Sequence, residues 1–128
     1  MPKAKPLILI VDDDESMREA IKGLMRSLGY RVEAVASAQE FLSSRHVRRT
    51  SCVIADMQMP GMTGLELYQR LSTSGKPIPT ILITAYPDDA VRERALSAGL
   101  IGYLSKPLRR MIARCIRSAL THADSGGR

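Results

Sequence analysis

Short segments with the pattern of β-strands alternate along this chain with segments whose apolar residues recur at helical spacing. Two of the strand-like segments, residues 7–11 and 52–55, are continuously apolar, which is typical of strands buried on both faces of a sheet. The others lie at residues 30–35, 79–84 and 101–104. Because strands and helices alternate through short connections, the pattern predicts right-handed crossovers and a parallel sheet with helices on both faces.

The expected fold class is α/β, with five parallel strands and five helices in a flavodoxin-like three-layer sandwich. Nothing in the sequence alone determines the order of the strands, but helices on both sides favour the order 2-1-3-4-5. This order places a switch point, where open parallel sheets bind ligands, between the first and third strands. The 128 residues are expected to form one domain over 1–128, with a core at about 7–120 and flexible ends at 1–6 and 122–128.

Capping patterns indicate where several helices should begin. In a capping box, a Ser or Thr is followed three residues later by Glu, and the two side chains satisfy backbone N–H groups at the helix N-terminus. Three such boxes lie at residues 16–19, 37–40 and 63–66. Pro87 fits the first position of a further helix. The buried stripe of that helix is expected to contain Val91, Ala95 and Ala98. The last helix has one apolar face, made of Leu108, Ile112, Cys115, Ile116 and Ala119.

Composition and charge restrict the class of protein without identifying it. Cys52 and Cys115 are not closely spaced, as a metal or redox motif would require, so both are expected to be buried reduced thiols. No apolar run approaches the ~20 residues of a membrane-spanning helix, and the N-terminus lacks the apolar stretch of a signal peptide. We therefore expect a soluble, cytoplasmic protein. The formal net charge of +6 suggests an acidic partner.

Several strand-like segments lead into polar side chains that could meet at one edge of the sheet. These side chains are Asp12 and Asp13, Asp56, Thr84 and Lys106. Two carboxylates about 4 Å apart repel by on the order of 4 kcal/mol at an effective dielectric constant near 20, so a cluster of them needs a compensating cation. Mg²⁺ takes oxygen ligands of this kind, and an aspartate can also be a nucleophile that forms an aspartyl phosphate. Taken alone, residues 12–15 also fit a solvated loop that begins a helix.

Four motifs resemble the receiver domain of two-component response regulators, of the chemotaxis-receiver type with an aspartate phosphoacceptor. They are Ile10-Val11-Asp12-Asp13, residues 56–64, Ile83-Thr84-Ala85 and Tyr103-Leu104-Ser105-Lys106-Pro107. Each motif alone is moderately specific, but all four in this order and at these spacings are highly specific. The resemblance covers the chain from Leu7 to about Leu120.

The resemblance implies a role for each acidic residue of the cluster. Asp56 would accept a phosphoryl group from the phosphohistidine of a histidine kinase, or from a small acyl or amido phosphate. Asp13, Asp56 and the backbone carbonyl of Gln58 would bind Mg²⁺ directly, and Asp12 would act through a water molecule. Such a protein would catalyse its own phosphorylation and dephosphorylation, but it would not be a conventional enzyme.

The resemblance also implies how the phosphoryl group is read. Lys106 would pair with the phosphoryl oxygens, and Thr84 would move to donate a hydrogen bond to one of them. Tyr103 resembles the switch aromatic of the family and could rotate inward into the space that Thr84 leaves. Phosphorylation would thereby change the face made by the fourth helix, the fifth strand and the fifth helix, and so control partner binding or self-association. This face would be basic, through Arg92, Arg110, Arg114 and Arg117. This face suits an acidic partner or a second copy of the domain, although it also fits a solvated polar surface.

Some positions depart from the family pattern. Asp14 adds a third consecutive carboxylate, which we expect to cap the first helix. Gln58 and Tyr86 occupy positions that tune phosphoryl hydrolysis in the family, and a bulky Tyr86 could shield the phosphoryl group from water.

Two other functions stay open. One is a receiver-like interaction module that takes no phosphate. The other is a metal-dependent phosphohydrolase on a similar fold, whose nucleophile would normally be followed two residues later by an acid, where this chain has Gln58. Nucleic-acid binding is not expected, because aromatic residues are few and no groove-reading motif is present. The downstream partner or output domain cannot be read from the sequence.

Overall fold

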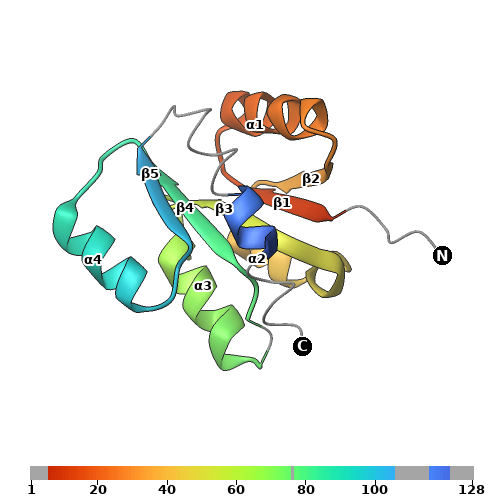
Figure 1. Cartoon of the computed structure of the whole chain (residues 1–128). Coiled ribbons are helices and arrows are strands. Elements are labelled where there is room, and N and C mark those ends of the chain that lie inside the picture. The colour runs from red at the N-terminus through yellow and green to blue at the C-terminus, as the bar shows by residue number, and fades with distance from the viewer. Residues whose placement is uncertain (1–5, 76, 106–115, 122–128) are drawn as a thin grey trace.

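A computed structural model describes residues 6–75, 77–105 and 116–121, and it contains a five-stranded parallel sheet (Figure 1). The strands are β1 (Leu7–Val11), β2 (Arg31–Val35), β3 (Thr50–Asp56), β4 (Thr80–Thr84) and β5 (Gly102–Ser105). The helices are α1 (Glu15–Ser27), α2 (Ala38–Leu42), the 3-10 helix η1 (Val47–Arg49), α3 (Gly64–Thr73) and α4 (Asp89–Ser97). Residues 116–121 are also helical. All strand pairs are parallel, in the order β2-β1-β3-β4-β5, which confirms the expected fold class and strand order.

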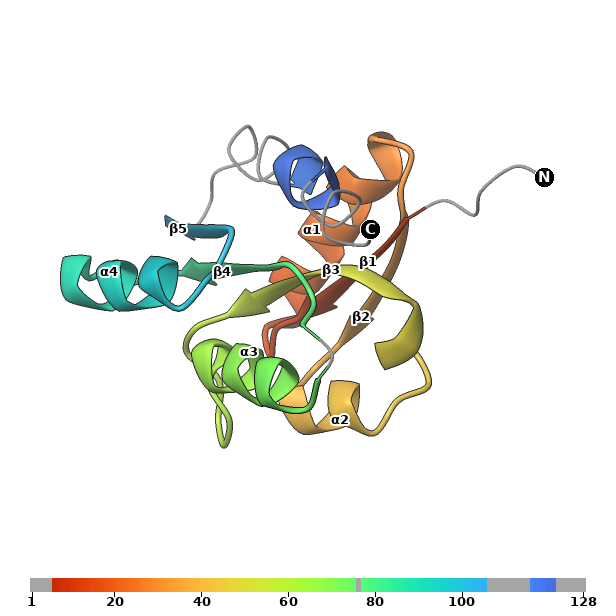
Figure 2. The same ribbon diagram turned by 60° about the horizontal axis from the view of Figure 1, so that its bottom comes forward.

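Helices cover both faces of the sheet, because side chains along each strand point alternately to opposite sides. Val53 and Ala55 of β3 belong to the core beneath α2 and α3, whereas Cys52 and Ile54 belong to the core beneath α1 and residues 116–121. Figure 2 shows α1 and the blue helical segment on one side of the sheet and α2 and α3 on the other. Every residue of β1 and β4 is buried, which fits the uninterrupted apolar run of β1 and the three apolar residues between the threonines that begin and end β4.

Ser37 and Thr63 are the N-cap residues of α2 and α3, as the sequence indicated. Thr63 and Glu66 form a complete capping box at α3, because each side chain accepts a hydrogen bond from the backbone N–H of the other residue. At α2, Oγ of Ser37 accepts from the backbone N of Glu40 at 3.0 Å. The carboxylate of Glu40 accepts instead from the backbone N of Ala36 at 3.2 Å, so this box closes one residue earlier than expected.

Aspartates cap α1 and α4, and each of these helices begins at the next residue. The side chains of Asp14 and Asp88 both accept hydrogen bonds from the backbone N–H groups two and three residues further on. The expectation that Asp14 caps α1 is confirmed, and the capping box expected at residues 16–19 is wrong. The placement of Pro87 at the first position of α4 is also wrong, because Pro87 precedes the cap.

Helix α4 packs less extensively than its apolar spacing indicated. Ala95 is fully buried and Val91 is half-buried, but Ala98, the third residue of the expected stripe, is exposed. Figure 2 shows α4 beside β5 at the margin of the sheet. A helix in this position has less of the sheet to cover, so fewer of its residues are enclosed.

Some expectations fall outside the residues that the structure describes. These concern the chain ends 1–5 and 122–128, Lys106, Leu108, Arg110, Ile112, Arg114 and Cys115. Cys52 is fully buried, as expected, and Ile116 and Ala119 pack in the same core as α1. Within the described ranges, no helix has the length and apolar character needed to cross a membrane.

Candidate functional site

The two central strands bring three aspartates together at their C-terminal ends. Val11 of β1 lies opposite Ala55 of β3, so Asp12 and Asp56 follow side by side. Asp12, Asp13 and Asp56 each offer a carboxylate oxygen, and these oxygens all lie within 4.8 Å of one another. Asp12 is 0% exposed and Asp56 is 5% exposed, whereas Asp13 is open to solvent. The structure therefore groups the three acids that the strand ends indicated.

Hydrogen bonds to the backbone orient the two buried carboxylates. Oδ1 of Asp12 accepts from the backbone N of Asp14 at 2.9 Å, and Oδ1 of Asp56 accepts from the backbone N of Gln58 at 3.0 Å. Both are Asx turns, in which an aspartate hydrogen-bonds the backbone two residues further on. Arg18 holds the first turn as well, because its Nη1 donates to the backbone carbonyl of Asp12 at 2.7 Å. The carboxylates are thus positioned by the chain's own local structure.

Gly64, the first residue of α3, packs directly against the backbone of Asp56. A Cβ atom at residue 64 would lie 2.6 Å from the carbonyl oxygen of Asp56 and 2.7 Å from Cδ2 of Leu82. Real Cβ atoms do not approach backbone oxygens this closely, so a larger residue would force α3 or β3 to shift. The sequence places Gly64 in a motif, but the close approach that requires glycine depends on the tertiary structure.

Thr84 ends β4 with its hydroxyl engaged in two hydrogen bonds. The residue is 0% exposed; Oγ1 donates to Oε1 of Gln58 at 2.7 Å and accepts from the backbone N of Tyr86 at 3.0 Å. The contact between Gln58 and Thr84 was not predicted, because the sequence motif implied only a role for the backbone carbonyl of Gln58 and an effect on phosphoryl hydrolysis. Tyr86, the expected shield, is 75% exposed.

Tyr103 of β5, the expected switch aromatic, is already inside the protein. It is 8% exposed, and its ring belongs to the core on the α3 side of the sheet. Its hydroxyl accepts a hydrogen bond from the backbone N of Asp88 at 3.2 Å, directly before α4. In this conformation the ring therefore links β5 to the start of α4.

The expected output face is described only in part. Arg92 of α4 and Arg117 are both exposed. Arg110 and Arg114 lie outside the described residues, as does Lys106, the expected partner of the phosphoryl oxygens. The basic output face and the role of Lys106 therefore stay predictions.

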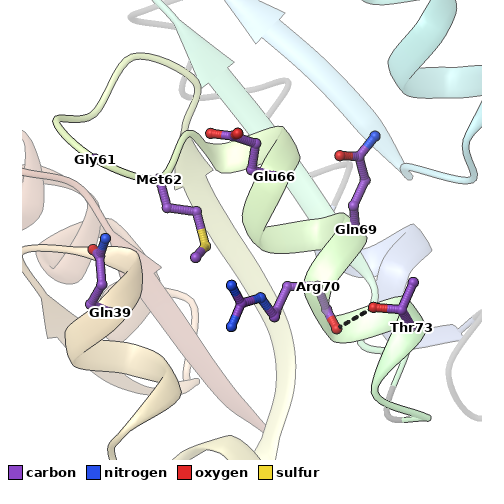
Figure 3. Close-up of a pocket in the computed structure, with 7 residues that line it drawn as sticks. All are labelled: Gln39, Gly61, Met62, Glu66, Gln69, Arg70 and Thr73. Atoms are coloured by element: carbon purple, nitrogen blue, oxygen red, sulfur yellow. Dashed lines mark hydrogen bonds between the residues drawn. The ribbon is translucent and has the colours of Figure 1, made fainter.

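A separate open depression of about 450 Å³ lies between α2 and α3 (Figure 3). It is lined by Gln39, Gly61, Met62, Glu66, Gln69, Arg70 and Thr73. Figure 3 shows Met62 between Gln39 and Arg70, and the Thr73 hydroxyl donating to the carbonyl of Arg70 at 3.1 Å. None of the three clustered aspartates lines this depression, so the chemistry of the acid cluster is not placed there.

The donor set of the acid cluster fits Mg²⁺. This ion prefers oxygen ligands and usually keeps several waters beside one or two carboxylates. Asp12 and Asp56 supply buried, oriented carboxylates, and the exposed Asp13 leaves one side of the cluster accessible to solvent. A divalent cation would also offset the mutual repulsion of three carboxylates held this close.

Comparisons with known sequences agree with this geometry. The family model of the response regulator receiver domain matches residues 8–115. The chain is 37% identical over 121 residues to the response regulator protein TmoT of Ectopseudomonas mendocina, and the match covers 94% of this chain and 55% of TmoT. It is 33% identical over 123 residues to the transcriptional regulatory protein FixJ of Bradyrhizobium diazoefficiens, with 92% of this chain and 60% of FixJ covered. The chain thus spans little more than half the length of these relatives.

A solved structure gives the same result. The response regulator receiver protein from Burkholderia phymatum has a TM-score of 0.77 and 42% sequence identity, and the match covers 91% of this chain and 96% of that one. Its agreement in fold and in length adds to the match of the family model over most of the chain. On this evidence, the chain belongs to the response regulator receiver domain family of two-component systems.

Proposed function

We propose that this receiver domain is a phosphorylation-dependent switch and that Asp56 is its phosphoacceptor. The observation that carries the proposal is the grouping of Asp12, Asp13 and Asp56 at the ends of the central strands. Asp56 is the last residue of β3, and its carboxylate is oriented by the backbone N of Gln58. An oriented, nearly buried carboxylate beside a cation-binding group of acids is suited to forming an aspartyl phosphate.

In the proposed reaction, a carboxylate oxygen of Asp56 attacks the phosphorus of a phosphohistidine on a histidine kinase. A new O–P bond forms, the P–N bond breaks, and the imidazole leaves with the electron pair. With acetyl phosphate the P–O bond breaks instead, and acetate leaves. Phosphoryl transfer of this type depends mainly on positioning and on charge neutralisation, since the transition state is loose and in line.

The residues of the chain share these tasks. Asp13, Asp56 and the carbonyl of Gln58 would hold Mg²⁺, with Asp12 acting through water; when bound, the ion neutralises charge on the phosphoryl oxygens. Lys106 is proposed to pair with the same oxygens. Neutralisation is needed because the incoming phosphoryl group enters a site that already contains three carboxylates.

The signal would leave the site through Thr84, whose hydroxyl would donate to a phosphoryl oxygen, and through Tyr103 and α4. The proposed result is a change in partner binding or self-association of a cytoplasmic regulatory protein that is not a conventional enzyme. FixJ is named a transcriptional regulatory protein and is longer than this chain. An output domain or downstream protein of that kind is a proposal for this receiver.

Intact-mass analysis tests the proposed phosphoacceptor. After incubation with acetyl phosphate and Mg²⁺, we expect the wild-type protein to gain the mass of one phosphoryl group, and removal of Mg²⁺ to abolish the gain. Asp56→Asn should not be labelled. Asp89→Asn, which removes an exposed acid from α4, should be labelled like the wild type.

Each other outcome points to a different function. A wild-type mass that stays unchanged with several donors would support an interaction module that takes no phosphate. Donor hydrolysis much faster than the loss of the phosphoryl group from the isolated phosphorylated protein would support the phosphohydrolase. Full labelling of the Asp56→Asn variant would show that the phosphoacceptor is another residue.

A further inference from the structure

Gln58 connects two residues of the site that lie on different strands. Its backbone N donates to Oδ1 of Asp56 at 3.0 Å, and its side-chain Oε1 accepts from Oγ1 of Thr84 at 2.7 Å. Thr84 is 0% exposed, and Gln58 reaches it from an exposed turn after β3. Gln58 therefore contacts both the proposed phosphoacceptor, Asp56, and the Thr84 hydroxyl, which is proposed to donate a hydrogen bond to the phosphoryl group.

The atoms involved determine the direction of the hydrogen bond between Gln58 and Thr84, because Oε1 of an amide can only accept. The backbone N of Tyr86 can only donate, and it donates to Oγ1 of Thr84 at 3.0 Å. The hydroxyl has a single proton, and the amide oxygen of Gln58 can accept it whereas the amide NH₂ group cannot. In this conformation the only proton of the Thr84 hydroxyl is therefore committed to Gln58.

We infer that the carboxamide of Gln58 is a latch that holds Thr84 in its unphosphorylated position, an inference that rests on the proposed function of Asp56. The Thr84 hydroxyl can donate to a phosphoryl oxygen only if its proton leaves Oε1 of Gln58. The two oxygens compete for one proton. A phosphoryl oxygen is charged and forms the stronger hydrogen bond, so phosphorylation displaces the neutral amide.

Burial makes this exchange a switch between two states. A buried hydroxyl without an acceptor is energetically unfavourable. Thr84 is buried, so its hydroxyl should keep its hydrogen bond to Gln58 until a phosphoryl oxygen is available as the new acceptor. Gln58 is thus a positioning residue that acts through Thr84 and opposes the phosphorylated conformation. Removing its acceptor should make that conformation easier to reach.

Three variants isolate the amide acceptor. Gln58→Met removes the acceptor but keeps an unbranched side chain and the backbone carbonyl proposed to bind Mg²⁺. Gln58→Glu retains an oxygen acceptor at the same reach. Gln69→Met is the control, because it makes the same Gln-to-Met substitution at an exposed position of α3. Gln69 lines the depression in Figure 3, and none of the three clustered aspartates does.

The first measurement is the affinity for beryllium fluoride, a phosphoryl analogue, in the presence of saturating Mg²⁺. We expect Gln58→Met to bind it about fivefold more tightly than the wild type, which corresponds to the loss of one net hydrogen bond of about 1 kcal/mol. Gln58→Glu should bind no more tightly than the wild type, and Gln69→Met should equal it. Titration with Mg²⁺ alone should give the same affinity for Gln58→Met and the wild type.

The second measurement needs no analogue. Three-bond NMR couplings report the χ1 rotamer of Thr84, which we expect to be single in the wild type and in Gln58→Glu and averaged in Gln58→Met. A fixed χ1 in Gln58→Met overturns the latch, whatever the analogue does. An analogue affinity that is unchanged or weaker in Gln58→Met also overturns it. If the wild type binds no analogue, the proposed function fails, and the rotamer measurement alone decides whether Gln58 holds Thr84.

Discussion

The two halves of the site are built differently, although both lie at the same edge of the sheet. Asp12 follows β1 and Asp56 is the last residue of β3, and both strands are paired on both sides within the sheet. The neighbouring helix α1 buries Ile21 and Met25. Thr84 ends β4, which is also paired on both sides, but Tyr103 lies on the edge strand β5. Strand β5 contacts α4, a helix whose only buried residue is Ala95.

A tyrosine hydroxyl contacts the backbone at each end of α4. The backbone N of Asp88 donates to the hydroxyl of Tyr103 before the helix, and the hydroxyl of Tyr68 donates to the carbonyl of Ala98 after it, both at 3.2 Å. Regions with few buried apolar contacts open at a lower free energy than a packed core. A phosphoacceptor must be positioned before the reaction, whereas the elements that respond to phosphorylation must move. The extensive packing around Asp56 suits the first role, and the sparse packing of α4 suits the second.

Truncation of a buried side chain in each half should produce the largest effects. Met25→Ala in α1 should lower the free energy of unfolding by about 2–5 kcal/mol, because Met25 is 0% exposed. Val91→Ala in α4 should cost only about 1 kcal/mol, since its side chain is half-buried. Urea denaturation of both variants measures the difference. Equal losses would mean that α4 is as firmly packed as α1.

Mg²⁺ should stabilise the half of the site that contains the acid cluster. A cation that binds only the folded state adds about 2.7 kcal/mol at a hundredfold excess over its Kd. The melting temperature of the wild type should therefore rise with Mg²⁺, and Asp13→Asn should reduce the rise. Asp13→Asn can also stabilise the metal-free protein, because it removes one of three repelling charges.

The exposed acid of α4 provides the matched control for the metal site. Asp89→Asn removes the same charge outside the acid cluster and should leave the Mg²⁺-dependent rise unchanged. If Mg²⁺ shifts the wild type and Asp13→Asn equally, Asp13 is not a ligand and the metal site is wrongly placed.

The aspartate caps of α1 and α4 make the comparison sharper, because both accept hydrogen bonds from two backbone N–H groups. Loss of an N-cap typically costs about 0.5–2 kcal/mol. Asp14→Ala should show this cost in global unfolding, since α1 is part of the core. Asp88→Ala should instead appear mainly as faster amide hydrogen exchange within α4. The Asn variants keep the capping acceptor without the charge, so they should behave like the wild type; if they do not, charge matters more than capping.

The sequence was sufficient for the framework of the fold. The continuous apolar runs of β1 and of residues 52–55 in β3 predicted strands buried on both faces, and their alternation with helices predicted a parallel sheet and favoured its order. The three aspartates could be grouped in advance because residues that end adjacent parallel strands must lie together. The capping box of Thr63 and Glu66 is local in sequence and was equally predictable.

Details that depend on side-chain conformation or on position in the fold could not be predicted. The hydrogen bond between Gln58 and Thr84 joins residues 26 positions apart and requires one particular rotamer of each. Ala98 has the spacing of a buried residue, but it is exposed because α4 lies at the margin of the sheet. The glycine at residue 64 is required by a distance between α3 and β3 that no local pattern encodes.

The smallest expected effects concern the two tyrosine hydroxyls that hold α4. Tyr103→Phe keeps a buried ring and removes the acceptor for the backbone N of Asp88, so it should cost about 0.5–1.5 kcal/mol. Tyr68→Phe removes a donor to the carbonyl of Ala98 in a solvent-exposed hydrogen bond, which water can replace, and should cost less. Hydrogen exchange should accelerate at the start of α4 in the first variant and hardly change at its end in the second. If Tyr68→Phe loosens α4 as much as Tyr103→Phe, the helix is held equally at both ends, and the link from β5 to the start of α4 has no special part in the switch.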